Sequence, residues 1–391
     1  MKKSLPPQGK ARLAALLKRT KDEATHMLGY PSTHLLDFSP LLSFMDSSFN
    51  NIGDPFAPSS YRVNTHDFER DVIAWFKKIL HAPAGDVWGY VTSGGTEGNM
   101  YGMYLAREFL PGGIVYYSED THYSIAKILR LVGARSIMIK SRPDGEMDYR
   151  DLADTLSIHR DSPPIIFANI GTTMRGAIDN LDTIKTILKD RAIHRYYIHA
   201  DAALSGMILP FTDNAQPFDF DAGIDSIAIS GHKMPGSPLP CGVVLARRSH
   251  TERIARAIEY IGTNDMTIAG SRSGIAPLYL WYVIQTLGVK GFRDIIAQCQ
   301  EIADYSIAAF SRHNTKAWRH KNSLTIVFPR NNDTVLKKWQ IATQGQDAHL
   351  ICMPHVTQEH IDRFLREWTT KSSDTELPTK KQACREYREI F

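Results

Sequence analysis

The sequence predicts an α/β protein in which a mostly parallel sheet, with helices on both faces, precedes a smaller α+β unit. Between residues 87 and 246, short apolar runs of strand length alternate with longer segments of helical period. The chain has 391 residues, which is more than one compact core usually serves. After about residue 270 the alternation stops and long helical segments follow. Such alternation is typical of a parallel sheet, so we expect one large α/β domain and one smaller domain.

The first 80 residues precede this alternation. Residues 9–28 predict a helix, because the leucines of this segment are spaced for one face. Residues 31–66 are rich in Ser, Asn and Pro and predict an extended arm. Residues 69–80 have the apolar spacing of an amphipathic helix.

Seven strands and four helices are expected in the alternating region. The strands are placed at 87–91, 114–117, 136–139, 164–170, 196–200, 226–229 and 242–246. The helices are placed at 97–108, 123–131, 149–157 and 181–190. Ligands of such sheets bind beyond the carboxyl ends of the strands, so residues that directly follow a strand are the first candidates for a site.

The rest of the chain predicts the smaller unit. Helices are expected at 276–287, 292–312 and 360–369, and short strands at 324–328 and 348–353. The domain organisation that follows is an N-terminal helix and arm over 1–66, a large domain over 67–275, a small domain over 276–371 and a charged tail over 372–391. We expect the tail to be flexible or to serve as an interaction segment.

Composition argues against several classes of protein. A net charge of +4 without a long basic run gives little support for a nucleic-acid partner. No apolar segment approaches the ~18 residues of a membrane span, and no signal-peptide stretch follows the basic N-terminus. The cysteines are Cys241, Cys299, Cys352 and Cys384. Their scattered positions argue against a disulfide framework and against a metal site of the zinc type, and they suit a reducing cytoplasm.

Lys233 has an unusual position for a lysine. It lies in a loop of Ser, Gly and His residues between two apolar runs, 224–229 and 241–246. Burial disfavours the ammonium form, lowers the pKa and makes the amine a nucleophile. Lysines of this kind form Schiff bases with carbonyls, including the aldehyde of pyridoxal phosphate. The alternative is a lysine that only pairs with a carboxylate.

Asp201 is the candidate for a second requirement of that cofactor. The pyridine nitrogen of pyridoxal phosphate must stay protonated to accept electrons, which calls for a carboxylate beside it. Asp201 follows the predicted strand 196–200, and the small residues after it would let a flat ring approach closely. Read alone, Asp201 could equally cap a helix.

Residues 90–99 suggest a phosphate site. They read YVTSGGTEGN, in which a strand ends, two glycines turn the chain, and Thr96 precedes a helix of apolar period. Backbone N–H groups at a helix start bind phosphate, which makes Gly95 and Thr96 candidates. The segment lacks the spacing of a nucleotide P-loop, and no GxGxxG follows a strand. The alternative is an ordinary Gly-rich turn with a threonine cap.

His122, Thr172 and Thr173 follow two further strand ends. An imidazole at position 122 could lie flat on a cofactor ring, although a lone histidine at a helix start is often a cap or a surface residue. The two threonines could hydrogen-bond a ring substituent. Each signal is modest, and the case depends on their joint placement after successive strands.

Five motifs occur in an order and spacing that resemble the group II, fold-type I pyridoxal-phosphate-dependent amino-acid decarboxylases. These motifs are TSGGTEGN, DTHYS, NIGTT, HADAA and SGHK. The likeness extends over roughly residues 35 to 365, and five short motifs in register are highly specific. The resemblance implies the fold of that family, with a mostly parallel seven-stranded sheet, and pyridoxal 5'-phosphate as cofactor.

The resemblance also implies roles for single residues. Lys233 would hold the cofactor through a Schiff base, and Asp201 would pair with the pyridinium nitrogen. His122 would stack on the ring and face the substrate, and Ala203 would lie under the other face. The implied phosphate contacts are Gly95, Thr96, Ser230 and His232. The implied contacts of the ring hydroxyl are Thr172 or Thr173.

The family forms homodimers with the active site at the subunit interface, so the resemblance implies a homodimer. Segments 50–54 and 270–274 would then help to line the substrate pocket of one subunit or of its partner. The implied substrate contacts are Asn51, Asp54, Ser271 and Arg272, together with His122. After CO2 leaves, Lys233, His122 or Tyr260 would return a proton to the α-carbon.

Substrate choice is less constrained than reaction type. Within the resemblance, the stretch ALSGMILPF at 203–211 is similar to family members that act on histidine and implies decarboxylation of L-histidine to histamine. Plant serine decarboxylases share much of the pattern, including a stretch like GDPF at 53–56, so L-serine is the alternative. An aminotransferase on the same fold is a further alternative, in which Arg319 or Arg330 would bind the α-carboxylate. The histidine at 122 favours the decarboxylase.

Overall fold

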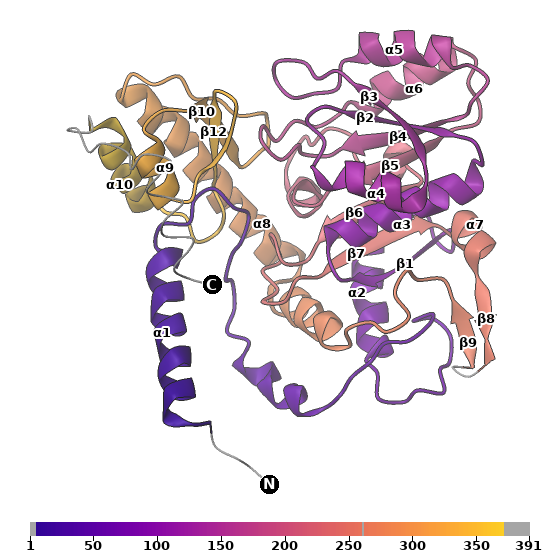
Figure 1. Ribbon diagram of the computed structural model, residues 1–391, viewed down its shortest axis with the longest axis horizontal. Coiled ribbons are helices and arrows are strands. Elements are labelled where there is room, and N and C mark those ends of the chain that lie inside the picture. Colours follow the sequence, from indigo (N-terminus) through magenta and orange to yellow (C-terminus); the bar gives the residue numbers. More distant parts are fainter. Residues whose placement is uncertain (1–4, 260–261, 371–391) are drawn as a thin grey trace, which may run out of the picture.

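A seven-stranded sheet forms the centre of the molecule (Figure 1) in a computed structural model that describes residues 5–259 and 262–370. The strand order is β1-β7-β6-β5-β4-β2-β3. Neighbours from β6 through β5, β4 and β2 to β3 run parallel, whereas β7 is antiparallel to both β6 and β1. The strands are β1 (Val87–Thr92), β2 (Ile114–Ser118), β3 (Arg135–Ile139), β4 (Pro164–Asn169), β5 (Tyr197–Asp201), β6 (Ser226–Ser230) and β7 (Gly242–Arg247). The predicted α/β class and mostly parallel sheet are confirmed.

Helices cover both faces of this sheet. The bounds are α2 (His66–Ile79), α3 (Gly95–Phe109), α4 (Ser124–Val132), α5 (Tyr149–Ile158), α6 (Leu181–Asp190) and α7 (Arg248–Thr251). One core is formed with α3 and α4, and the other with α2, α5 and α6. In β1, Trp88 and Tyr90 belong to the first core, and Val87 and Val91 to the second. Alternate side chains of a strand point to opposite faces, so strands buried on both sides read as continuous apolar runs.

The C-terminal unit contains a long bent helix and a small sheet. Helix α8 (Ile275–Arg312) changes direction at Gly288, whose φ of 57° is outside the helical region. The two helices predicted at 276–287 and 292–312 are therefore the two arms of α8. The remaining elements are β10 (Thr325–Pro329), α9 (Asp333–Lys338), β11 (Ala342–Gln344), β12 (Asp347–Ile351) and α10 (Gln358–Thr369). The domain boundaries given above stay a prediction, and the predicted tail at 372–391 lies outside the described residues.

Several short elements differ from the sequence expectation. The arm predicted to be extended over 31–66 contains the 3-10 helix η1 (Ser39–Asp46), and a hairpin of β8 (Arg256–Ile258) and β9 (Thr263–Asp265) was not expected. Other 3-10 turns are η2 (Ser205–Met207), η3 (Leu209–Phe211), η4 (Phe220–Ala222) and η5 (Glu252–Ile254). Apart from η1, which has eight residues, these elements have three residues each, which is too short for a periodic signal in the sequence.

Helix α1 (Pro7–Ala24) projects away from the rest of the molecule (Figure 1). None of its residues is buried, and Leu13, Leu16 and Leu17 are each about half exposed or more. The amphipathic pattern predicted a buried face for this helix, and within the described part of a single chain that face has no cover.

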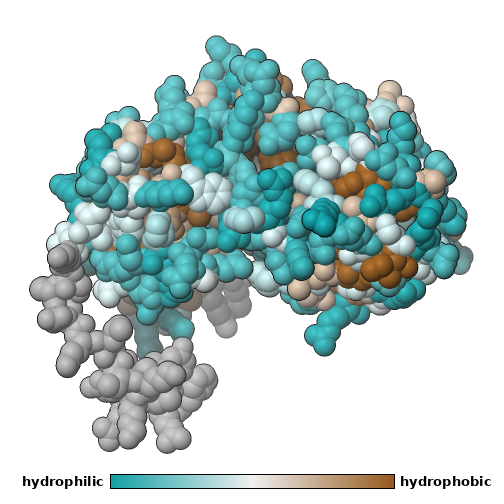
Figure 2. Space-filling model, turned by 90° about the horizontal axis from the view of Figure 1, so that it is seen from above, coloured by the Kyte–Doolittle hydropathy of each residue, from teal (hydrophilic) through white to brown (hydrophobic). Residues whose placement is uncertain are grey.

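The molecular surface in Figure 2 is mainly hydrophilic, with small separate apolar patches. Across residues 5–259 and 262–370, no helix combines the length and the apolarity that crossing a bilayer requires.

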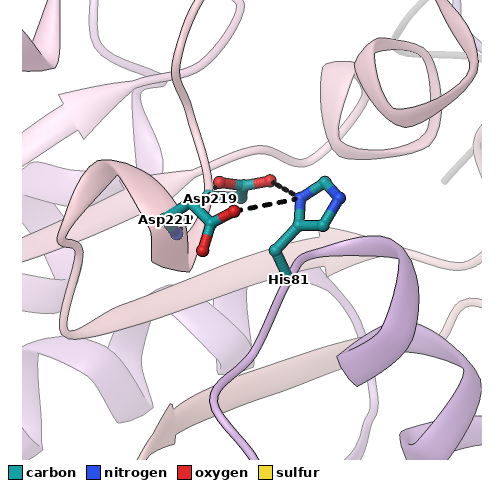
Figure 3. Close-up of side chains that lie close together, drawn as sticks. All are labelled: His81, Asp219 and Asp221. Atoms are coloured by element: carbon teal, nitrogen blue, oxygen red, sulfur yellow. Dashed lines mark hydrogen bonds and ion pairs between the residues drawn. The ribbon is translucent and has the colours of Figure 1, made fainter.

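A surface cluster of His81, Asp219 and Asp221 joins the end of α2 to the loop before β6 (Figure 3). His81 Nδ1 lies 2.6 Å from Asp219 Oδ2 and 4.0 Å from Asp221 Oδ2. The other oxygen of Asp219 accepts a hydrogen bond from the Asp221 backbone N–H at 3.2 Å. Both oxygens of Asp219 are thus used within the fold, and the cluster is an ion pair that fixes two loops.

This ion pair predicts a pH dependence of stability. The hydrogen bond to Asp219 raises the pKa of His81, and burial opposes this shift. A histidine with a raised pKa stabilises the fold below its unfolded-state pKa of about 6.5, and the contribution is lost as the pH rises through the folded-state pKa. Because the His81 side chain is 60% exposed, we expect only about 0.5 kcal/mol. Asparagine tolerates the φ of 49° at this position, so His81→Asn is the suitable variant.

Urea unfolding at pH 5.5 and pH 8.5 measures this contribution. The deficit of the variant relative to the wild type should be larger at the lower pH. An equal deficit at both pH values, or a larger one at pH 8.5, would contradict the assigned role.

Candidate active site

A cavity of about 320 Å³ lies beyond the carboxyl ends of β4, β5 and β6. The start of α3, the Gly29–Pro31 segment and parts of the small sheet complete its wall. All ten residues that the sequence placed around the cofactor line this cavity: Gly95, Thr96, His122, Thr172, Thr173, Asp201, Ala203, Ser230, His232 and Lys233. Parallel strands bring residues that are far apart in the sequence to one edge, which explains why these motifs meet.

Lys233 lies in the turn between β6 and β7, and its side chain is partly buried. Desolvation lowers the pKa of the Lys233 amine, and the negative charge of Asp201 opposes this shift. The turn is fixed by hydrogen bonds from Gly231 N to Cys241 O at 2.8 Å and from Gly236 N to Lys233 O at 3.0 Å. A fixed amine with a lowered pKa is suited to attack an aldehyde.

Asp201 is the last residue of β5 and is 8% exposed. One carboxylate oxygen accepts a hydrogen bond from Asn99 Nδ2 at 2.8 Å, and the other accepts one from the Ala203 N–H at 3.2 Å. Asp201 does not cap a helix, which was the alternative left open by the sequence, because the next helix, η2, has Leu204 at its N-cap.

The start of α3 offers backbone N–H groups of the kind that bind anions. Gly94 precedes the helix without a side-chain cap among the described residues, so the first N–H groups of the helix are free for a ligand. A Cβ added to Gly95 would lie 2.7 Å from Ser230 Oγ and 3.6 Å from Ala203 Cβ. Glu97 reaches back to the Ser93 N–H at 2.7 Å and fixes the turn. Glycine at 95 therefore keeps open the space between the helix start and β6.

His122, in the loop between β2 and α4, also lines the cavity. Its Nδ1 accepts a hydrogen bond from the Ser124 N–H at 3.3 Å and lies 2.8 Å from Ser124 Oγ. Desolvation lowers the pKa of His122, while Asp201 raises it and Lys233 lowers it. The ring is therefore favoured as a neutral imidazole with its proton on Nε2.

Thr172 and Thr173 lie in the loop that follows β4. The Thr172 hydroxyl accepts a hydrogen bond from the Ala177 N–H at 3.0 Å, so its own proton is free to be donated. Thr173 is exposed on the wall of the cavity.

These groups fit pyridoxal phosphate. An amine for the aldehyde, a carboxylate for a protonated ring nitrogen and a helix start for a phosphate share one cavity. The small side chain of Ala203, next to Gly95, leaves room for a flat ring.

The four other predicted substrate contacts do not line this cavity. Arg272 forms an ion pair with Glu69 and donates to Gly53 O at 3.0 Å, and Asn51 Nδ2 donates to Glu69 at 2.7 Å. Asp54 accepts from Trp88 Nε1 at 3.0 Å, and Ser271 accepts from Asn50 Nδ2 at 3.0 Å. The segments 50–54 and 270–274 lie side by side. Their contact with substrate in a neighbouring copy stays a prediction, and Tyr260 lies outside the described residues.

Two further residues, Asn99 and His199, were not identified from the sequence. They form a hydrogen-bonded chain that ends at Asp201. His199 Nε2 lies 2.9 Å from Asn99 Oδ1, and His199 Nδ1 lies 2.7 Å from Ser226 Oγ. His199 precedes Asp201 by two positions in β5 and so shares its face of the sheet. A polar residue at that spacing on an otherwise apolar strand is a signal that the sequence offered. Asn99, the last residue of TSGGTEGN, is buried one turn into α3.

The C-terminal unit contributes a further missed residue. His349 of β12 lines the cavity, with Nδ1 3.1 Å from Met174 O and Nε2 3.1 Å from Gly29 O. No sequence signal relates His349 to the strand ends of the large sheet.

Comparison with known protein families gives one match over residues 56–328, to the pyridoxal-dependent decarboxylase conserved domain. The chain is 43% identical to histidine decarboxylase of Mesorhizobium japonicum, over 92% of this chain and 98% of that protein. It is 49% identical to histidine decarboxylase of Acinetobacter baumannii, over 84% of this chain and 86% of that protein. Among solved structures, L-methionine decarboxylase from Streptomyces sp. 590 is similar, with a TM-score of 0.84, 26% identity and coverage of 94% and 96% of the two chains.

The close packing of Gly102 against His199 predicts that one added methyl group at position 102 will lower the stability of the fold. A Cβ added to Gly102 would lie 2.2 Å from His199 Nδ1, so Gly102→Ala must displace a buried ring. We expect a loss of about 1–3 kcal/mol in the free energy of unfolding, measured by urea titration. Gly270→Ala is the matched control, because its added Cβ meets no atom within 4 Å in the described structure. Equal stabilities of the two variants would contradict this account.

Proposed function

The chain belongs to the pyridoxal-dependent decarboxylase family, and we propose that it converts L-histidine to histamine and CO2 with pyridoxal 5'-phosphate as cofactor. The main support is that Lys233, Asp201 and the start of α3 line one cavity. The relatives named above support the substrate, because those that are 43% and 49% identical over most of their length are histidine decarboxylases. The sequence alternatives, L-serine decarboxylation and transamination, are not favoured.

We propose the following cofactor contacts. Lys233 would hold the aldehyde of the cofactor, and Asp201 would pair with the ring nitrogen. His122 and Ala203 would contact the ring. The phosphate contacts are Gly95, Thr96, Ser230 and His232. The contacts of the ring hydroxyl are Thr172 or Thr173.

When bound, the cofactor supplies an aldehyde for the amino group and a protonated ring that accepts the electron pair of the broken Cα–carboxylate bond. The residues of the chain provide the rest. The lowered pKa of Lys233 favours the neutral amine, which is the form that would bond to the cofactor's aldehyde. The Asp201 carboxylate would stabilise a proton at the ring nitrogen. A proton must then reach the α-carbon of the product, and Lys233, His122 and Tyr260 remain the proposed donors.

The substrate site extends toward the small sheet. Ser323 and Thr325 supply hydroxyl groups on that wall of the cavity, whereas both ring nitrogens of His349 already face backbone carbonyl oxygens. An imidazole has two ring nitrogens, and leaving one of them unpaired in a buried site costs about 1–3 kcal/mol. This wall therefore supports a polar aromatic substrate better than an apolar one.

We further propose that the enzyme is a homodimer whose subunits meet through α1 and the neighbouring arm. Helix α1 has an apolar face that its own chain leaves uncovered, with Leu13, Leu16 and Leu17 exposed. Apolar stripes of this kind are typical of interfaces. The partner would also bring Asn51, Asp54, Ser271 and Arg272 into range of substrate.

A cytoplasmic location is proposed as well. Cys241, Cys299 and Cys352 are buried free thiols, and such thiols are typical of reducing compartments.

A substrate screen tests the proposed activity. Purified protein loaded with pyridoxal phosphate should release CO2 from L-histidine and yield histamine. Lys233→Ala should lose at least about 10³-fold in turnover, because the covalent site of the cofactor is removed. Borohydride reduction followed by peptide mapping should label Lys233. Amine production from serine but not histidine, keto-acid formation, or labelling of another lysine would contradict the proposal.

The dimer is tested by charge on α1. In the double variant Leu13→Glu/Leu17→Glu, buried carboxylates would oppose association, so the dissociation constant should rise by at least about tenfold. Sedimentation velocity over a concentration series measures it. Leu131→Glu is the matched control, since Leu131 is an equally exposed leucine on α4. A monomeric wild type, or equal dissociation constants for both variants, would refute the α1 interface.

A further inference from the structure

A continuous chain of buried side chains runs from Asp201 away from the cavity. Asn99 Nδ2 donates to Asp201 at 2.8 Å, and His199 Nε2 lies 2.9 Å from Asn99 Oδ1. Ser226 Oγ lies 2.7 Å from His199 Nδ1, and the Tyr197 hydroxyl donates to Ser226 Oγ at 2.9 Å. His199, Ser226 and Tyr197 have no exposed surface, and Asn99 is 3% exposed. We refer to Tyr197, Ser226, His199 and Asn99 as the relay.

Hydrogen-bond chemistry gives the relay one direction. Tyr197 donates to Ser226, so the serine proton is free to be donated to His199 Nδ1. A histidine that accepts at Nδ1 carries its proton at Nε2, where it donates to the Asn99 carbonyl oxygen. The Asn99 amide then points its NH2 group at Asp201. Every donor in the relay is oriented toward the carboxylate.

Burial keeps the central histidine neutral. Desolvation lowers the pKa of His199 to about 3. A neutral ring with one donor and one acceptor matches its two partners, whereas a charged ring with two donors would lose the acceptor at Nδ1.

Two glycines of α3 provide the space for this arrangement. A Cβ at Gly102 would lie 2.2 Å from His199 Nδ1, and a Cβ at Gly98 would lie 2.8 Å from Ala228 Cβ on β6. Helix α3 can therefore lie close enough to β5 and β6 for Asn99 to reach both His199 and Asp201.

We propose that His199 is a positioning residue that acts through Asn99 to keep the Asp201 carboxylate oriented as the acceptor for the cofactor's ring nitrogen. This inference rests on the proposed function and deepens it. Without the N–H of His199, the Asn99 amide could rotate and present its oxygen to Asp201, where two acceptors would repel each other. The carboxylate would then turn away or lose its negative charge, and its hold on the ring nitrogen would weaken.

The test compares two cofactors on each variant. One is pyridoxal phosphate, and the other is its carbocyclic analogue, in which a CH group replaces the ring nitrogen. Both retain the aldehyde and the phosphate, so the ratio of their dissociation constants isolates the contact with Asp201. Absorbance titration of the full-length protein measures both constants, and no turnover is needed.

The relay predicts a pattern across four variants. His199→Phe and Asn99→Ala should each reduce the preference for pyridoxal phosphate by at least about tenfold, as expected for a hydrogen bond to a charged group. His199→Gln keeps an N–H near the Nε2 position and should retain the wild-type preference within about threefold. His66→Phe alters another buried histidine, outside the relay, and should leave the ratio unchanged.

The outcomes separate this inference from the proposed function. A wild type that fails to bind pyridoxal phosphate overturns both. The wild type could bind the cofactor and decarboxylate histidine while the variants weaken the binding of both cofactors equally. That result would overturn the relay alone and would leave His199 with a role in packing. If His199→Phe does not fold, the other two variants still test the inference. An unchanged ratio of the two dissociation constants in Asn99→Ala would refute it, and so would a loss of the preference for pyridoxal phosphate in His199→Gln.

Discussion

The hydrogen bond between Asn99 of α3 and Asp201 of β5 is the interaction on which the rest of the site depends. It joins helix α3 to the carboxylate at the end of β5. The distance between the start of α3 and the Asp201 carboxylate is thereby set by protein packing. Gly98 and Gly102 allow this close approach, since a side chain at either position would press α3 away from β5 and β6. A preorganised site of this kind loses little free energy on reorganisation when the cofactor binds.

The electrostatic balance of the cavity follows from the same packing. Lys233 and His122 both carry pKa values lowered by burial, and the nearby Asp201 opposes both shifts. Strands buried on both faces create the low-dielectric surroundings that cause these shifts. Burial thus favours a neutral amine and a neutral imidazole beside a carboxylate, and the neutral amine is the form that attacks an aldehyde.

The C-terminal unit completes the cavity and is attached to the large sheet by polar contacts. Arg175, two residues after Thr173, bridges Asp120 and Asp347 at 2.7 Å each. His349 lies between carbonyl oxygens of Met174 and Gly29. These contacts join the loop after β4, the small sheet and the N-terminal segment around one wall of the site. This wall of the cavity thus combines segments separated by more than 300 residues of sequence.

The sequence by itself determined the large sheet, the helices between its strands and the residues at the strand ends, because strands buried on both faces produce long apolar runs and strand ends carry small and polar motifs. It also placed Lys233, Asp201 and His122 together, since parallel strands end at one edge. Tertiary structure alone decided the relay behind Asp201, the contribution of His349 and the pairing of Arg272 with Glu69. These depend on contacts between distant segments, and local periodicity carries no information about which buried polar groups will meet.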